Sequence, residues 1–308
     1  MVDSAHIPGI KKAILFSKIL LLFWCLSLIG SVAKGKPTKK DTSQHILWKV
    51  TSKDGQTGYL VGSVHALKPN IYPLATVYQR AFKNSDQLVF EVNIDSLKAH
   101  RFSLMRRFGY LPSGTMLKDT LSGQTYQLLK KQLGSLGLPI ARFQHMKPWL
   151  VSIVIMDMKL RKAGYQEGID QHFFTRAQKA GKQRIGLESP AFQFRLLDNL
   201  SSVLTEKYIK HSLHKADRTV SQINKIVSAW KRGDVTRLDS LVDGAMRRDN
   251  PALYKALVLK RNRNWMPKIM RLLNNSKTTM IIVGAGHMVG KNGLVSQLRR
   301  QGYQVQQL

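Results

Sequence analysis

Two glycine–histidine pairs with the same spacing are the clearest chemical feature of this sequence. Gly62 precedes His65 near the start of the chain, and Gly284 precedes His287 near its end, each pair directly after an apolar, β-rich run. Each imidazole would therefore stand at the end of a strand, where a neutral ring nitrogen can bind a metal ion. One such pair alone is more typical of a hydrogen-bonded structural histidine. Two pairs in equivalent places favour a shared site.

Glu91 is the third candidate ligand. It lies inside the apolar run at residues 88–92, where an unpaired ionised carboxylate is costly to bury. The alternative is a glutamate on an edge strand that faces solvent. With His65 and His287 it would give an oxygen and two nitrogens, a donor set for a divalent metal with positions left for water. Such a site generates hydroxide near neutral pH.

Four further polar residues could assist this chemistry. Asp170 follows Gly168 at the start of a helical pattern, so it is either a helix cap, the commoner role, or a site carboxylate. Glu188 comes directly after a short apolar strand, as Glu91 does. Arg261 and Asn264 lie three residues apart on one face of a helix, and the alternative to a site role is a solvated basic face. We expect Glu188 or Asp170 to orient a ligand or move a proton, and Arg261 to polarise a carbonyl, with Asn264 beside it.

Strand patterns at both ends of the chain and helical patterns between them must position these residues. Alternating or continuous apolar runs indicate strands at residues 47–50, 58–64, 87–94, 182–187, 278–283 and 303–306. Helical spacing covers residues 74–84, 97–108, 122–136, 148–161, 168–180, 191–230, 251–273 and 289–301, with Pro267 as a kink or break. The fold class is therefore α/β, with a central mixed sheet built from the N- and C-terminal parts of the chain and a large helical insertion. Residues 58–64 and 278–283 should be neighbouring strands, which would bring the two histidines together.

The N-terminus has the pattern of a secretory signal peptide, residues 1–33. Lys11 and Lys12 precede the apolar run at residues 13–29, and small residues follow at 31–33. The alternative is an uncleaved N-terminal anchor, and both interpretations export the rest of the protein. A lipoprotein signal is disfavoured because bulky Trp24 precedes the single cysteine. We therefore expect a periplasmic or secreted protein.

Composition bounds the remaining possibilities. The 308 residues, 43% hydrophobic and 22% charged, have enough apolar mass for a globular domain and exclude a disordered, collagen-like or polytopic membrane protein. Residues 34–45 form a basic, disordered lead-in, and residues 46–308 a single domain. The net charge of +31 suits an acidic peptide or an anionic envelope surface. Because the basic residues are spread instead of clustering with aromatics, no nucleic-acid partner is expected.

The order of the motifs resembles the TraB/PrgY/GumN family, over essentially all of residues 46–308. The motifs that carry the resemblance are Gly-Ser-Val-His at 62–65, Tyr-Pro-Leu at 72–74, the strand with Glu91, Gly-x-Asp at 168–170, Gly-Leu-Glu at 186–188, Arg-Asn-x-Asn-Trp at 261–265 and Gly-Ala-Gly-His at 284–287. This family includes the Tiki-type metalloproteases. The resemblance implies dependence on a divalent metal of the manganese or cobalt type, with zinc also compatible. Most bacterial members have no established substrate.

Two functions of different classes follow from these observations. The first is an exported metal-dependent hydrolase, a peptidase, in which His65, Glu91 and His287 hold a metal that activates water for attack on a carbonyl. The second is a non-catalytic protein that uses the same pocket to bind or sequester a peptide or an envelope polymer. A metal requirement for turnover would separate the two.

Overall fold

The computed structural model describes residues 44–199, 206, 209–210, 213 and 218–308. The predicted signal peptide and residues 34–43 of the predicted lead-in lie outside the described residues. Residues 44 and 45 already belong to the fold, because the backbone N–H of His45 donates to the carbonyl of Leu308 at 2.5 Å. Within the described part of the chain, no helix combines the length and the apolar character needed to cross a membrane.

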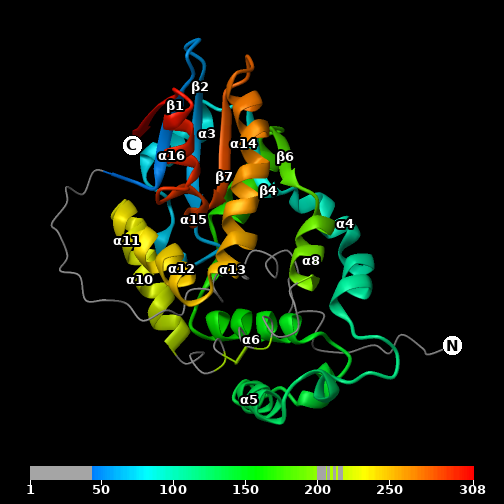
Figure 1. Ribbon diagram of the computed structural model, residues 1–308. Coiled ribbons are helices and arrows are strands. Elements are labelled where there is room, and N and C mark those ends of the chain that lie inside the picture. The colour runs from blue at the N-terminus through cyan, green and yellow to red at the C-terminus, as the bar shows by residue number, and fades with distance from the viewer. Residues whose placement is uncertain (1–43, 200–205, 207–208, 211–212, 214–217) are drawn as a thin grey trace.

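Six strands of the described chain form one mixed sheet in the order β6-β4-β7-β2-β1-β8 (Figure 1). Their bounds are β1 Leu47–Thr51, β2 Thr57–Ser63, β4 Gln87–Val92, β6 Gln183–Glu188, β7 Thr279–Gly284 and β8 Gln304–Gln307. The two ends of the chain supply all of them except β6, which comes from the middle and lies at one edge. The expected α/β fold with a central mixed sheet is confirmed.

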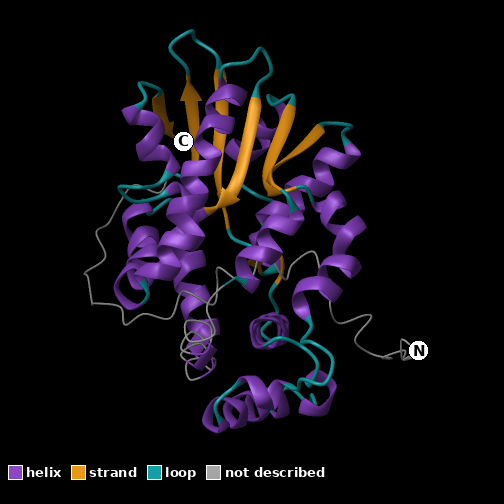
Figure 2. Cartoon of the chain, turned by 45° about the vertical axis from the view of Figure 1, so that its right-hand side comes forward, coloured by secondary structure: helices purple, strands orange, loops and turns teal. Residues whose placement is uncertain are grey.

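The parallel strands bring the candidate site together. β2 runs parallel to β7 with Gly58 opposite Thr279 and Ser63 opposite Gly284, so the predicted neighbours are indeed neighbours. β4 is parallel to both β6 and β7, and the four parallel strands therefore end at the same edge of the sheet. β1 and β8 are antiparallel additions at the other side. Residues of β4 and β7 are buried throughout, as expected for strands that helices cover on both faces (Figure 2).

The helices surround the sheet and extend beyond its site edge. Figure 1 shows α14 and α16 in front of the sheet, with α5 and α6 beyond the edge where the parallel strands end. The α-helices are α3 Thr76–Lys83, α4 Ile94–Leu104, α5 Gly123–Gly134, α6 Pro148–Lys162, α7 Ile169–Lys179, α8 Pro190–Asp198, α10 Thr219–Lys231, α11 Val235–Asp239, α12 Ala245–Asp249, α13 Pro251–Tyr254, α14 Lys260–Leu273, α15 Ala285–Met288 and α16 Leu294–Arg300. Single 3₁₀ or π turns lie at Pro69–Ile71, Met105–Gly109, Leu117–Thr120, Ile140–Phe143, Ser240–Gly244 and Lys255–Leu259.

Two capped turns fix where the strands with the candidate glutamates end. The side chain of Asn93 accepts from the backbone N–H groups of Asp95 and Ser96 and so starts α4 directly after β4. Ser189 accepts from the N–H of Phe192 at 3.2 Å and starts α8 directly after β6. Each glutamate is thus held at the last residues of a strand before a capped helix.

Two local features differ from the sequence-based expectation. Residues 251–273 are helical throughout, as predicted, but a π turn at Lys255–Leu259 lies between α13 and α14, and Pro267 lies inside α14. In addition, β3, Ala66–Leu67, pairs with β5, Gln166–Glu167, in a small two-stranded sheet that the sequence pattern did not indicate. Runs of two residues are too short to show periodicity.

Candidate active site

The three predicted metal ligands meet around Gly284. An alanine Cβ at this position would lie 3.3 Å from Oε1 of Glu91, 3.4 Å from Nε2 of His65 and 3.7 Å from Cδ2 of His287. The N–H of Gly284 donates to Oε1 of Glu91 at 2.9 Å. All three side chains are buried, and β4 lies between β6 and β7 in the sheet. Glu91 is therefore not a solvent-facing glutamate on an edge strand.

His65 is oriented by a carboxylate. Its Nδ1 lies 2.7 Å from Oδ2 of Asp170, and each side chain is 4% exposed. The start of α7 can approach so closely because a Cβ at Gly168 would lie 2.1 Å from the carbonyl oxygen of Val64. Gly168 takes the capping position of α7, so Asp170 is not its cap. Burial lowers the pKa of His65, but Asp170 outweighs it and raises this pKa above its usual value.

His287 is oriented by an amide. Its Nδ1 lies 2.7 Å from Oδ1 of Asn262, whose Nδ2 donates to the carbonyls of His287 and Asn292, both at 3.1 Å. Because the amide oxygen faces the ring, Nδ1 carries the proton and Nε2 is the acceptor. Burial and the charge of Arg261 lower the pKa of His287 to about 3, so the ring is neutral near pH 7.

The two histidines share one arrangement at Nδ1, which a side chain on a helix holds in each case. Nε2 of His65 lies beside Gly284, where Oε1 of Glu91 also lies. A held Nδ1 is typical of metal-ligating histidines, because it fixes the tautomer and the direction of the ring. Nε2 of His287 and Oε1 of Glu91 are 4.0 Å apart. Two donors that each lie roughly 2.0–2.2 Å from one ion can span this distance.

Arg261, buried on α14, lies among these groups. Its NH2 donates to Oε2 of Glu91 at 2.6 Å and to Oε2 of Glu188 at 2.8 Å. Its NH1 lies 3.2 Å from Nε2 of His287, and the π turn before α14 gives NH1 the carbonyl of Leu257 at 3.4 Å. Burial raises the pKa of Glu91, but Arg261 and the two histidines outweigh it and lower this pKa to about 2. Glu91 is thus an anion, with a permanent cation beside it.

Glu188 holds Arg261 in place. Its Oε1 accepts from Nε of Arg261 at 2.9 Å and from Nε1 of Trp265 at 2.8 Å, and its Oε2 accepts from Nε2 of Gln193 at 3.2 Å. Both carboxylate oxygens of Glu188 thus accept hydrogen bonds, and this side chain fixes the position of the Arg261 guanidinium. Trp265 also packs against the ring of His287, with 4.4 Å between ring centroids.

Of the two asparagines in the Arg-Asn-x-Asn-Trp motif, the structure brings only Asn262 to the described site. Asn262 is fully buried, whereas Asn264 lies on the exposed side of α14. The three-residue spacing predicts Asn264 beside Arg261, whereas the structure buries Arg261 and leaves Asn264 on the exposed side of the helix. Apolar Trp265, Met266 and Ile269 mark the buried face, and this signal in the sequence could have found Asn262.

Comparison with known proteins identifies a family for this chain. The model of the TraB/PrgY/gumN family matches residues 46–307. The chain belongs to this family. Its relatives include the uncharacterized protein YbaP of Shigella flexneri and of Escherichia coli, each 24% identical over 83% of this chain and 94% of the relative. A metalloprotease TIKI homolog of Nematostella vectensis is 22% identical over 87% of this chain and 68% of the relative. No solved structure matches the chain.

Whether this TraB/PrgY/gumN member can hold a metal depends on the donors around Gly284. Two imidazoles and a carboxylate are donors suited to a first-row divalent cation, and the neutral His287 and anionic Glu91 are in the forms that bind metals. Within the described residues, however, no three His, Cys, Asp or Glu side chains already stand in a ligating arrangement. Arg261 contacts both Glu91 and His287. The donor chemistry fits a metal, and a cation that binds there must compete with Arg261 for Glu91.

Proposed function

We propose that this protein is an exported hydrolase that depends on a divalent metal of the manganese or cobalt type and cleaves peptides. The names of its TIKI relatives support a metalloprotease. Export rests on the signal-peptide pattern of residues 1–33. The observation that carries the proposal is the pair of buried histidines, each held at Nδ1, that meet Glu91 around Gly284.

In this proposal the ligands are His65, Glu91 and His287. The metal, when bound, supplies a Lewis acid and lowers the pKa of a water molecule. The protein supplies the orientation: Asp170 fixes His65, and Asn262 fixes His287 in the tautomer whose Nε2 is free of its proton. Both supports are buried, so the rings cannot turn away without breaking a hydrogen bond in a site of low dielectric.

Arg261 and Glu188 have a different task. Arg261 is a fixed positive charge that keeps Glu91 ionised despite burial, and Glu188 together with Trp265 fixes the position of Arg261. A guanidinium that is already held by anions requires little reorganisation when negative charge develops on a substrate carbonyl. Glu188 thus acts through Arg261 and does not carry a proton in this proposal.

A second function is favoured by one specific observation. Arg261 already neutralises Glu91 and contacts Nε2 of His287, as expected if the site works without a metal. The protein would then bind or sequester a peptide or an envelope polymer without turnover.

A cleavage assay separates the two functions. The mature protein, stripped with a chelator, is incubated with a degenerate peptide library with and without manganese or cobalt, and new termini are identified by mass spectrometry. We expect new termini only with metal and none with Glu91→Gln, with Asp54→Asn in the exposed β1–β2 turn as the matched control. Binding of peptides without cleavage under every metal condition would favour the sequestering function.

A further inference from the structure

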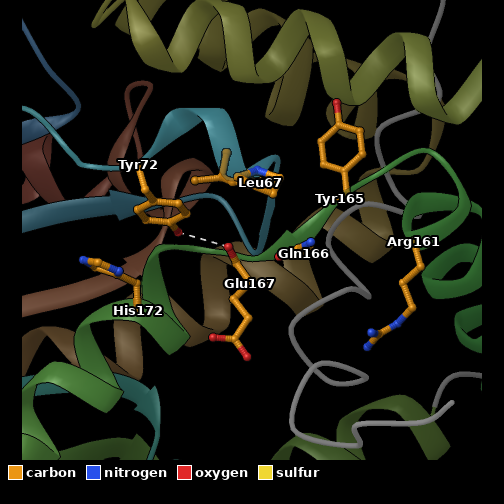
Figure 3. Close-up of a pocket in the computed structure, with 8 residues that line it drawn as sticks. Leu67, Tyr72, Arg161, Tyr165, Gln166, Glu167 and His172 are labelled. Atoms are coloured by element: carbon orange, nitrogen blue, oxygen red, sulfur yellow. Dashed lines mark hydrogen bonds between the residues drawn. The ribbon is translucent and has the colours of Figure 1, made fainter. Parts of the chain in front are cut away.

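A pocket of about 710 Å³ is lined by chain segments that follow His65 and flank Asp170 (Figure 3). Such a volume is typical of a site for a small ligand or for a substrate side chain with its adjoining backbone. Its walls come from β3 and the 3₁₀ turn after it, from the end of α6, from the segment around β5 and from the start of α7. They include Leu67, Tyr72, Arg161, Tyr165, Glu167 and His172.

The pocket is joined to the His65–Asp170 pair through the chain itself. Ala66, the neighbour of His65, pairs with Glu167 in the small β3–β5 sheet, and Asp170 follows Glu167 after two residues. Burial raises the pKa of Tyr72, and the negative charges of Asp170 and Glu167 raise it further. The short segment at residues 167–170 therefore contributes Asp170 to the active site and Glu167 to the pocket.

The shape of this wall is fixed by Tyr72. Its hydroxyl donates to the backbone carbonyl of Glu167 at 3.0 Å, and its ring stacks on that of His172 with 4.7 Å between centroids. Figure 3 shows the carboxylate of Glu167 directed away from Tyr72, with the backbone carbonyl and not the carboxylate in the hydrogen bond. The pocket thus has aromatic and aliphatic walls with a carboxylate free to meet a ligand.

The unbalanced charge of the described lining is negative. Arg161 is paired through Nε with Oδ2 of Asp157 at 2.6 Å, whereas Glu167 has no ion pair with any described residue. Burial and Arg176 lower the pKa of His172 to about 4, so this ring adds no charge near neutral pH. One competing feature is NH2 of Arg161, which is buried without a hydrogen-bond partner among the described residues and could accept an anion.

We propose that this pocket receives a lysine or arginine side chain of the substrate peptide, with Glu167 as the specificity-determining residue. The aliphatic part of such a side chain packs against Leu67 and Tyr72, while its cationic end pairs with Glu167. The ammonium group of Lys68 lies 5.4 Å from the ring centroid of Tyr165 and already occupies this aromatic face. The cationic end of the substrate side chain therefore pairs with the carboxylate of Glu167 and not with the Tyr165 ring. The assignment rests on the proposed function, since it names the substrate class of the same site.

A binding selection tests this without turnover. Protein in a chelator, at physiological ionic strength, is mixed with a degenerate peptide library, and bound peptides are separated by gel filtration and sequenced by mass spectrometry. We expect lysine or arginine to be enriched about 10-fold at one position for the wild type. Glu167→Gln should abolish the enrichment and Glu167→Lys should shift it to aspartate or glutamate. The control Asp54→Asn, in the exposed β1–β2 turn, changes the net charge by the same amount as Glu167→Gln and should leave the enrichment of lysine or arginine intact.

The following outcomes overturn the assignment, except the last, which bears on the hydrolase alone. No enriched position, or enrichment that persists in Glu167→Gln, removes Glu167 as the determinant. Enrichment of acidic residues by the wild type would assign the pocket to Arg161 instead. Cleavage with manganese but without a basic preference would sink this inference alone, whereas basic enrichment without any cleavage would sink the hydrolase alone.

Discussion

The two Gly-x-x-His motifs look alike in sequence, yet the structure uses them differently. Gly62 is a packing glycine: a Cβ there would lie 2.4 Å from Cγ2 of Ile46 and 3.1 Å from Cα of Ala285. Gly284 instead faces the site, where a Cβ would meet Glu91 and His65 at 3.3–3.4 Å. The first glycine lets neighbouring elements approach each other, and the second lets side chains converge.

The two histidines differ in their electrostatics as well. His65 is held by the carboxylate of Asp170, which raises its pKa despite burial. His287 is held by the neutral amide of Asn262 beside the guanidinium of Arg261, and its pKa falls to about 3. A repeated motif therefore fixes where an imidazole stands, while residues from α7 and α14 decide its proton affinity.

The largest expected effect comes from the group that the two motifs share. Glu91→Gln removes the anion that faces both histidines, and an amide oxygen is a weaker ligand than a carboxylate. We expect metal affinity to fall by more than about 100-fold, with activity lost in parallel. Isothermal titration with manganese or cobalt measures this. Unchanged affinity would mean that Glu91 is not a ligand.

The variant Glu188→Gln should distinguish the residue that positions Arg261 from the residues that bind the metal. It weakens the hold on Arg261 but touches neither histidine, so metal affinity should stay within a few-fold while turnover falls by roughly 10- to 100-fold. Titration and kinetics on the same preparation provide both values. If metal were lost here and retained in Glu91→Gln, the two glutamates would have exchanged roles.

The glycines offer a matched pair of alanine substitutions. Gly62→Ala should lower the free energy of unfolding by about 1–3 kcal/mol through overpacking, because the backbone of Ala285 cannot move freely. Gly284→Ala should cost less stability but lower metal affinity. Denaturant unfolding and metal titration of both variants test this comparison. If the two substitutions changed the free energy of unfolding and the metal affinity equally, the two glycines would have the same role.

The histidines should titrate apart in metal-free protein. NMR of the imidazole protons should show His65 titrating above 6.5 and His287 uncharged down to low pH, near 3. Because the folded pKa of His65 is raised, its contribution to stability is present below pH 6.5 and is lost as pH rises through the folded value. Asp170→Asn should therefore destabilise more at pH 5 than at pH 9. Equal losses would show that charge plays no part in this pair.

The sequence predicts the fold and the meeting of His65, Glu91 and His287 because long apolar runs reveal strands and parallel strands share an edge. It does not predict the β3–β5 pairing, since two-residue strands have no period. It also places Asn264 beside Arg261, because residues three apart on a helix lie only about 60° apart around its axis. In the structure the boundary between the buried and exposed sides of α14 falls between these two residues. The apolar residues of α14 indicate that Asn262 is buried, but the roles of Glu188 and Asn262 depend on contacts between segments far apart in the chain.

Metal content tests the central claim most directly. The mature protein and the variants His65→Ala and His287→Ala are equilibrated with manganese or cobalt, passed over a desalting column and analysed for metal per folded chain. The account predicts about one ion per chain in the wild type and little in either variant, with both variants still folded by circular dichroism. A wild type without metal, or variants that retain it fully, would contradict a metal centre built on the two Gly-x-x-His motifs.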